Sequence, residues 1–353
     1  MPPVKPTGVP LKYVVGIDIA KSSFVACLGS LDLSQQLSFG KETTFDNTAS
    51  GFTALLSWVT QQQGAAAPLW FVVEATGVYY EELAYFLADN QQLLSVLLPN
   101  KVKHFARSTE LKSKTDQLDA RLLARLGLER SLPAWQPPTA ALRQLRALAR
   151  ERQVLTKQGA QLKARAHAYQ HSYQPDTRTL ARLAAQQQLV IQQLAALDQD
   201  VAELLAAEPE LARKLTHLTS IPGIGQTTAI IVVAETSGFV LVENERQLAS
   251  YAGLDVVQRQ SGLSAYATRI SKRGNVRLRT ALYLPALSSL RHNPRQAAFY
   301  NRLRTRHPSG KPGVIAVMRK LLVLCYSLWK NDHAYDPNYH PAHLTEKEIA
   351  PTT

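Results

Sequence analysis

The chain has 353 residues, of which 45% are hydrophobic and 19% are charged, so a wholly disordered or fibrous protein is excluded and two or three folded domains are expected. The 40 Lys and Arg residues against 27 Asp and Glu residues give a net charge of +13, which favours nucleic acid as a partner over an acidic membrane surface. We find no membrane span in the sequence, and two cysteines in apolar runs indicate buried thiols in the cytoplasm.

The N-terminal third of the chain alternates strand-like and helix-like segments. Residues 1–10 hold four prolines and are expected to be a flexible leader without a signal peptide. Residues 11–135 are predicted to form an α/β domain, in which Pro99 ends the last strand. The expected strands are 13–19, 24–28, 36–45, 69–74 and 93–98, and the expected helices are 48–63, 78–90 and 116–128.

The rest of the chain is predicted to be mostly helical. Residues 136–212 carry leucines at spacings of three, four or seven, which predicts an antiparallel coiled-coil hairpin or dimerisation arm. Its first helix is rich in Arg and Lys, and a solvated face over a structural spacer is the alternative interpretation. Residues 213–330 are expected to form a compact helical domain, followed by a flexible tail over residues 331–353.

Four acidic residues stand at positions that suit a metal site. Asp18 interrupts an apolar strand and Glu74 ends another, and an unpaired charge there is costly. Asp116 and Asp119 are spaced i, i+3 on one helical face, although a helix cap with a first-turn acid explains them equally. Together these oxygens suit Mg²⁺ or Mn²⁺ and an in-line phosphoryl displacement. Nearby cations that are expected to hold a polyanion are Lys101, Lys103, Arg107, Lys112 and Lys114.

Two further motifs lie in the C-terminal third. The segment 219–225 (TSIPGIG) is typical of a helix–hairpin–helix turn, in which Gly223 and Gly225 let backbone N–H groups approach a DNA phosphate; a plain connecting turn is the alternative. Downstream, Ser261 lies beside a glycine. With no adjacent His as base, this pattern indicates phosphate binding more than nucleophilic attack. The cations around it are Arg259, Arg269, Lys272, Arg273 and Arg277.

The order of these motifs resembles one family, the DEDD transposases of insertion sequences of the IS110 and IS1111 type, which are bridge-RNA-guided recombinases. The resemblance covers nearly the whole chain. The motifs that carry it are 16–21 (GIDIAK), 73–77 (VEATG), 114–120 (KTDQLDA), 221–225 (IPGIG), 251–254 (YAGL), 261–262 (SG) and 269–275 (RISKRGN).

The resemblance implies an RNase H/RuvC-like N-terminal domain, a coiled-coil middle and a C-terminal transposase domain. It implies that Asp18, Glu74, Asp116 and Asp119 are catalytic ligands of Mg²⁺, and that Ser261 attacks a DNA phosphate to form a covalent phosphoserine. In this family the acids of one protomer and the serine of another form one site, and a structured noncoding RNA selects donor and target DNA. A homodimer that assembles into a tetramer is expected, in the bacterial cytoplasm and associated with the nucleoid.

Two departures from the family pattern leave the nucleophile open. Gln260 replaces a serine that is common there, and Leu263 replaces the second glycine, so Ser264 competes with Ser261. The main alternative function is a RuvC-like, metal-dependent nuclease or junction resolvase that uses activated water. An actin-like ATPase and a non-catalytic nucleic-acid scaffold are two further hypotheses for the chain.

Overall fold

The computed structural model of the protein divides into two compact units, Met1–Pro137 and Pro138–Thr353. It describes residues 9–63, 67–109, 116–257, 260–261, 264–265, 269–305 and 309–339. The predicted nucleic-acid-binding residues Lys112, Lys114 and Arg259 lie outside the described residues. Each unit is described by itself below.

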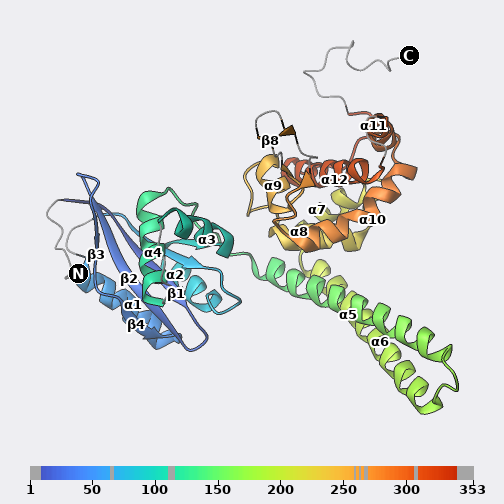
Figure 1. The fold of residues 1–353 in the computed structure, drawn as a ribbon, viewed down its shortest axis with the longest axis horizontal. Helices are drawn as coiled ribbons and strands as arrows, with labels where there is room; N and C mark the ends of the chain where they lie inside the picture. Colours follow the sequence, from blue (N-terminus) through green and yellow to red (C-terminus); the bar gives the residue numbers. More distant parts are fainter. Residues whose placement is uncertain are drawn as a thin grey trace, which may run out of the picture. The chain divides into compact units, whose positions relative to one another are not determined.

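The first unit is built on one mixed six-stranded sheet (Figure 1). Its strands run in the order β3-β2-β1-β5-β6, and β4 also pairs with β2. The central strand β1 is antiparallel to β2 and parallel to β5, which is in turn parallel to β6. The strands are β1 (Pro10–Ile19), β2 (Ser23–Asp32), β3 (Leu37–Phe39), β4 (Thr43–Asp46), β5 (Leu69–Glu74) and β6 (Leu93–Leu97).

Helices cover both faces of this sheet, which explains why β1 is apolar at successive positions. Alternate side chains of a strand point to opposite faces. Val15 and Ile17 therefore pack in one cluster with residues of α1 (Ala49–Gln62) and α2 (Glu81–Asp89). Val14 packs on the other face with residues of α3 (Pro99–Ser108) and α4 (Asp116–Glu129).

Two details of the first unit differ from the sequence prediction. The strand expected at 36–45 is two strands, β3 and β4, which pair with different parts of β2 and are separated by residues 40–42. Helix α3 is not predicted at all. Pro99 does end β6, but it is also the first residue of α3, a position where its missing N–H costs nothing.

The second unit begins with two 31-residue helices, α5 (Ala140–Gln170) and α6 (Thr177–Ala207), which pack against each other as an antiparallel hairpin (Figure 1). Each helix buries an apolar stripe, to which Leu155, Leu183 and Val190 belong. The remaining helices are α7 (Pro209–Thr219), α8 (Gln226–Thr236), α9 (Glu245–Tyr251), α10 (Val276–His292), α11 (Pro294–Arg304) and α12 (Lys311–Asn331).

The base of the hairpin belongs to the same hydrophobic core as the C-terminal helices. Leu145 of α5 and Val201 of α6 lie in one cluster with Leu218, Val232 and Leu321 of α7, α8 and α12. The predicted boundary at residue 212 therefore falls inside a continuous core, whereas the outer part of the hairpin projects from it (Figure 1).

Helix α12 is long and apolar enough to cross a membrane, with a mean hydropathy of 1.4 over its most apolar window, and no other helix of the described residues meets both conditions. Half of that window is buried inside the protein, and residues from Val314 to Leu328 belong to the core of the second unit. A helix buried in a protein core meets the same criteria of length and apolar composition as a membrane-spanning helix.

Candidate active site

The first two predicted acids lie side by side at one edge of the sheet. The parallel register pairs Ile17 of β1 with Val73 of β5, so Asp18 and Glu74 occupy the next pair of positions. Both are half-buried. Neighbouring positions of parallel strands point to the same face, and the residues two positions earlier, Gly16 and Val72, are on the α4 face. The two carboxylates therefore extend toward the α4 side of the sheet.

Helix α4 lies directly on Gly16. A Cβ atom at Gly16 would stand 2.1 Å from both the Ala120 carbonyl oxygen and the Ala124 amide nitrogen, so only glycine allows this approach. Further along the same helix, Gly127 packs on the Val14 side chain of β1, where a Cβ atom would stand 2.7 Å from Val14 Cγ1. Helix α4 thus runs antiparallel to β1, and its N-terminal turn lies toward the strand end that carries Asp18.

That N-terminal turn supplies the other two predicted acids, Asp116 and Asp119. Carboxylates are favoured there by the positive end of the helix dipole. All four acids thus share one face and one edge of the first unit. The Thr76 hydroxyl donates to Glu74 Oε1 at 3.5 Å. In the described part of the chain, no three His, Cys, Asp or Glu side chains are gathered closely enough to hold a metal ion.

Helix α3 adds exposed cations on the same face of the sheet. It follows β6, whose C-terminal end lies at the same edge as those of β1 and β5. Val102 and Phe105 anchor α3 in the cluster that also contains α4 residues. The predicted cations Lys101, Lys103 and Arg107 are exposed.

In the second unit, Ser261 lies on a small β ribbon that the sequence analysis does not predict. The ribbon comprises two separate strand pairs, and in the first of them β7 (Val256–Val257) pairs with β10 (Arg269–Ile270). Between them, β8 (Gln260–Ser261) pairs with β9 (Ser264–Ala265), and the register places Ser261 opposite Ser264. The two competing serines are therefore backbone partners on neighbouring strands.

The basic segment after β10 is held against the turn that follows α9. The Ser271 N–H donates to the Asp255 carbonyl at 2.9 Å, the Lys272 N–H to the Gly253 carbonyl at 3.1 Å, and the Asn275 N–H to the Tyr251 carbonyl at 2.7 Å. The predicted cations Arg269, on β10, and Lys272 and Arg273, in this segment, are exposed. Backbone hydrogen bonds thus fix the segment and leave these side chains facing solvent.

A buried carboxylate, Glu235, anchors the end of this segment. Its side chain is 1% exposed and accepts hydrogen bonds from Arg150 Nε at 2.7 Å, Arg150 Nη2 at 3.1 Å and Asn275 Nδ2 at 2.7 Å. Asn275 also caps the N-terminus of α10. Arg277, a predicted phosphate contact, lies 3.9 Å from Glu235 Oε1. One carboxylate therefore connects α5, α8 and the basic segment.

These contacts determine the charge state of Glu235. Burial raises its pKa, but the hydrogen bonds from Arg150 and Asn275 and the charges of Arg150 and Arg277 outweigh burial, so the pKa is below its ordinary value. Glu235 is not among the predicted site residues. It ends the apolar run 229–234, which is the signal that singles out Asp18 and Glu74.

The two glycines of the 219–225 turn have different surroundings. Gly223 has a φ of +100°, and a Cβ there would stand 2.9 Å from Ser289 and 3.0 Å from the Pro285 carbonyl of α10. Packing against α10 therefore explains the glycine at 223 without a ligand. Gly225 is exposed and is the N-cap of α8, and a Cβ atom there would meet nothing within 4 Å.

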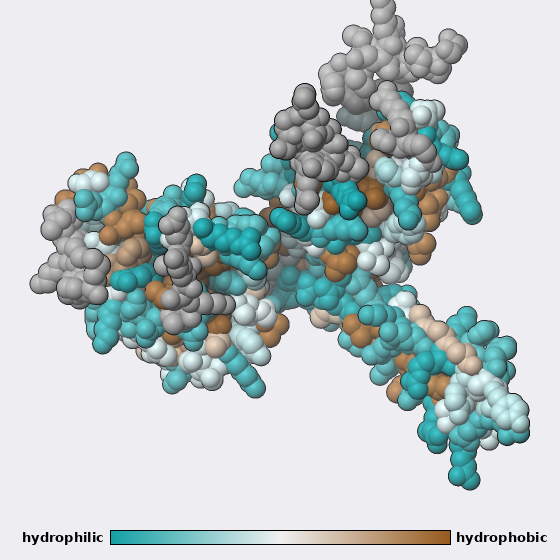
Figure 2. Space-filling model, in the orientation of Figure 1, coloured by the Kyte–Doolittle hydropathy of each residue, from teal (hydrophilic) through white to brown (hydrophobic). Residues whose placement is uncertain are grey.

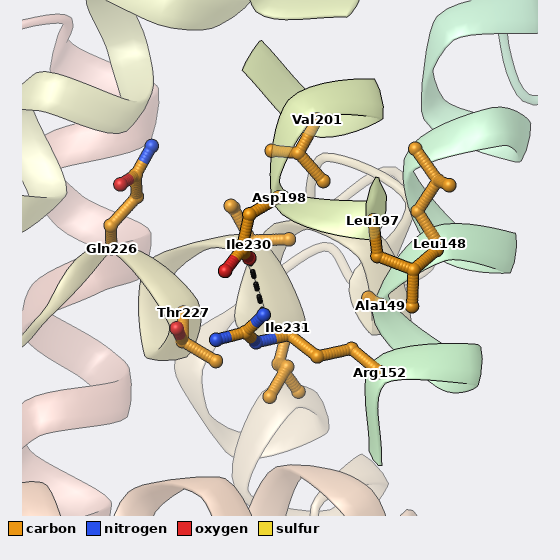
Figure 3. Close-up of a pocket in the computed structure, with 10 residues that line it drawn as sticks. All are labelled: Leu148, Ala149, Arg152, Leu197, Asp198, Val201, Gln226, Thr227, Ile230 and Ile231. Carbon is orange, nitrogen blue, oxygen red and sulfur yellow. Dashed lines mark hydrogen bonds and ion pairs between the residues drawn. The ribbon is translucent and has the colours of Figure 1, made fainter. Parts of the chain in front are cut away.

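The first turn of α8, just after Gly225, borders a cavity of about 300 Å³ between α5, α6 and α8 (Figure 3). Arg152 and Asp198 form an ion pair across it. An anion bound at the N-terminus of α8 would therefore face the Arg152 guanidinium, whose charge is already balanced by the Asp198 carboxylate. The lining residues are Leu148, Ala149, Arg152, Leu197, Asp198, Val201, Gln226, Thr227, Ile230 and Ile231.

Comparison with known proteins identifies the family. The DEDD transposase model for IS110 matches residues 15–175, and the transposase model of the IS116/IS110/IS902 family matches residues 215–301. The chain is 32% identical over 337 residues to the pilin gene-inverting proteins of Moraxella lacunata and Moraxella bovis, which covers 93% of this chain and 99% of each relative. The chain belongs to the IS110 family of DEDD transposases. It is therefore a DNA-modifying enzyme of the transposase and recombinase class.

Further relatives share parts of the chain with this IS110-family transposase. The transposase for IS1111A of Coxiella burnetii is 39% identical over 93 residues, 26% of each chain. Among solved structures, a Ppx/GppA family member from Aquifex aeolicus aligns over 92% of each chain, but at 8% identity and a TM-score of 0.22 that likeness does not bear on the fold. Because the chain belongs to this family, an enzyme that acts on DNA is favoured over the actin-like ATPase and the non-catalytic scaffold.

Proposed function

We propose that this transposase exchanges DNA strands under the guidance of a structured noncoding RNA, through a covalent phosphoserine intermediate. RNA guidance and the phosphoserine follow from the family resemblance. The metal-dependent cutting of DNA is supported by the placement of Asp18 and Glu74 on adjacent strand ends, toward the N-terminal turn of α4 that bears Asp116 and Asp119. Four acids from three elements thus share one face and edge of an α/β unit, which is where the proposed RNase H/RuvC-like metal site would assemble.

The donor set fits a hard divalent cation. All four side chains offer carboxylate oxygens, which Mg²⁺ and Mn²⁺ prefer. Asp18, Glu74, Asp116 and Asp119 would hold the ion, whose binding would draw their carboxylates together. Asp116 is the most exposed of the four. A bound ion supplies charge stabilisation for the attacking and leaving oxygens of a phosphoryl transfer. Lys101, Lys103 and Arg107 would hold the DNA backbone beside it.

Ser261 is the proposed nucleophile. Its hydroxyl oxygen forms a bond to a DNA phosphorus, its proton is lost to solvent, and one backbone P–O bond breaks to release a DNA hydroxyl end. The exposed Arg269, Lys272 and Arg273 would position the phosphate. The backbone N–H groups that follow Gly225 lie at the other end of α8 from Glu235 and Asn275, so they would contact a different phosphate of the DNA. In the second half of the exchange, a hydroxyl end of the other duplex attacks the phosphoserine and regenerates the serine.

The ribbon carrying Ser261 and the acidic edge belong to different units of the chain. We infer that the acids of one protomer act with the serine of another in a homodimer that pairs into a tetramer. The α5–α6 hairpin, apart from its outer end, would act as a coiled-coil arm in that assembly. The working location would be the bacterial cytoplasm, on the nucleoid.

For the test, the protein is purified from its native host, and the RNA that co-purifies with it is sequenced. The DNA substrate is a supercoiled plasmid that carries the gene with its natural flanking sequences. With Mg²⁺, the wild-type protein should give a protein–DNA conjugate on a denaturing gel, and Asp18→Asn and Ser261→Ala should not. Ser264→Ala is the matched control and should still form the conjugate. A conjugate that survives Ser261→Ala and disappears in Ser264→Ala would reassign the nucleophile to the opposite strand of the ribbon.

The second candidate function is a RuvC-like nuclease or junction resolvase that uses water as the nucleophile. The same four acids favour it, because they suffice for metal-assisted hydrolysis without the serine. It predicts cut DNA with free ends, no conjugate, and full cutting by Ser261→Ala. Absence of a specific, abundant RNA in the purified complex would remove RNA guidance from the proposal and leave the cutting chemistry untouched.

A further inference from the structure

The outer end of the α5–α6 hairpin carries a concentrated positive charge. Residues 153–197 contain five Lys and Arg residues and a single acid, Asp176. Four of these cations lie within about two and a half helical turns of the connecting loop. We call them the tip cluster: Lys163, Arg165, Arg178 and Arg182, all exposed.

The one acid at the tip is already committed to the fold. Asp176 caps α6, because its carboxylate accepts the backbone N–H groups of Arg178 at 3.3 Å and Thr179 at 2.9 Å. It also accepts the Thr179 hydroxyl at 2.7 Å and lies 3.7 Å from Arg182. These contacts, led by those from Thr179, hold its pKa below the ordinary value, so it stays ionised at neutral pH. Of the tip cluster, only Arg182 is paired with this acid in the described contacts.

The apolar surface of the tip is small, which argues against a protein partner there. Leu183, the nearest buried leucine, faces the interior of the hairpin, and Tyr173, 90% exposed, stands alone among the large exposed hydrophobic residues between positions 155 and 188. The end of the hairpin is correspondingly hydrophilic in Figure 2. Two copies meeting at this point would bring like charges together.

We propose that the tip cluster is a second DNA contact, which binds the phosphate backbone of duplex DNA outside the site of strand exchange. Each helix of the hairpin is about 46 Å long at 1.5 Å per residue, so the tip reaches well beyond the helical core of the second unit. Its lysine and arginine side chains suit phosphates rather than base edges. This inference rests on the chain being a DNA-modifying enzyme and is independent of the metal and the serine.

The test measures binding of a fluorescent 40-base-pair DNA duplex as a function of salt. The variant Lys163→Gln/Arg165→Gln/Arg178→Gln should bind at least about tenfold more weakly at low salt, and the slope of log K against log salt should fall by about 2 to 3, since each lost phosphate contact removes roughly 0.9. The charge-retaining variant Lys163→Arg/Arg165→Lys/Arg178→Lys should bind like the wild type.

A second control removes the same net charge elsewhere on the second unit. Arg246→Gln/Arg291→Gln/Arg304→Gln changes three exposed cations outside the hairpin and should leave the slope nearly unchanged. All variants should melt like the wild type, because exposed substitutions rarely change stability by more than about 0.5 kcal/mol. The proposal would be overturned if the two triple glutamine variants lost equal affinity for the duplex. It would also be overturned if the tip-cluster variant lost affinity for a structured RNA probe but not for the duplex. The conjugate assay of the proposed function is scored separately, so either can fail alone.

Discussion

Replacing Glu235 with glutamine tests whether one buried carboxylate anchors the basic segment behind the Ser261 ribbon. Glu235 accepts three hydrogen bonds from Arg150 and Asn275 while 1% exposed. Removing one partner of a buried ion pair costs about 3–5 kcal/mol. Arg150 is 45% exposed and can regain water, so we take the lower end, about 3 kcal/mol. For a unit of this size that lowers Tm by roughly 9 °C.

The pH dependence of this effect has a definite sign. The folded-state pKa of Glu235 lies below its ordinary value, so its carboxylate contributes stability above the unfolded pKa of about 4.3 and loses that contribution as pH falls through the folded value. The difference in Tm between wild type and Glu235→Gln should therefore be complete at pH 7 and shrink below about pH 4.

Calorimetry of the full chain measures both quantities. Glu151→Gln is the matched control, because Glu151 is exposed, lies next to Arg150 and undergoes the same chemical change. Its Tm should stay within about 2 °C of the wild type. The anchoring role would be refuted if Glu235→Gln had the same Tm as Glu151→Gln at pH 7. It would also be refuted if the difference in Tm between Glu235→Gln and the wild type were as large at pH 3 as at pH 7.

Three further predictions follow from the packing. Gly16→Ala places a methyl group against the backbone of α4 and should lower the free energy of unfolding, measured by urea titration, by about 2–3 kcal/mol; an unchanged free energy would refute the α4 contact. Gly223→Ala should lower Tm, because φ is +100° and α10 fills the space, whereas Gly225→Ala should not; equal melting of the two variants would contradict this. Burial raises the pKa of the Cys27 and Cys325 thiols to about 12, so a thiol reagent at pH 8 should react only after denaturation, and rapid reaction of the native protein would count against burial.

The elements of the first unit could be predicted where periodicity was strong. The continuous apolar runs of β1 and β5 indicate strands buried on both faces, and the structure has them there. Helix α3 escapes prediction because only Val102 and Phe105 mark its buried face and Pro99 suggests a stop. The β ribbon around Ser261 escapes because its four strands are two residues each, too short for any period to appear.

The candidate site is predictable to a different extent in each unit. A charge at the end of an apolar strand singles out Asp18 and Glu74, but their adjacency depends on the parallel pairing of β1 with β5, which no local pattern encodes. Glu235 gives the same local signal within a helix, yet its partner Arg150 is 85 residues away in sequence. Long-range partners of this kind become visible only in the folded chain.

The most direct test of the central claim mixes two inactive proteins. Asp18→Asn lacks one of the four proposed metal ligands, and Ser261→Ala lacks the proposed nucleophile. The two proteins carry tags of different size. With Mg²⁺ and the plasmid substrate, we predict that neither protein alone forms a DNA conjugate and that the mixture does, with the DNA attached only to the Asp18→Asn chain. A mixture that stays inactive while the wild-type protein reacts, or a conjugate on the Ser261→Ala chain, would contradict the account.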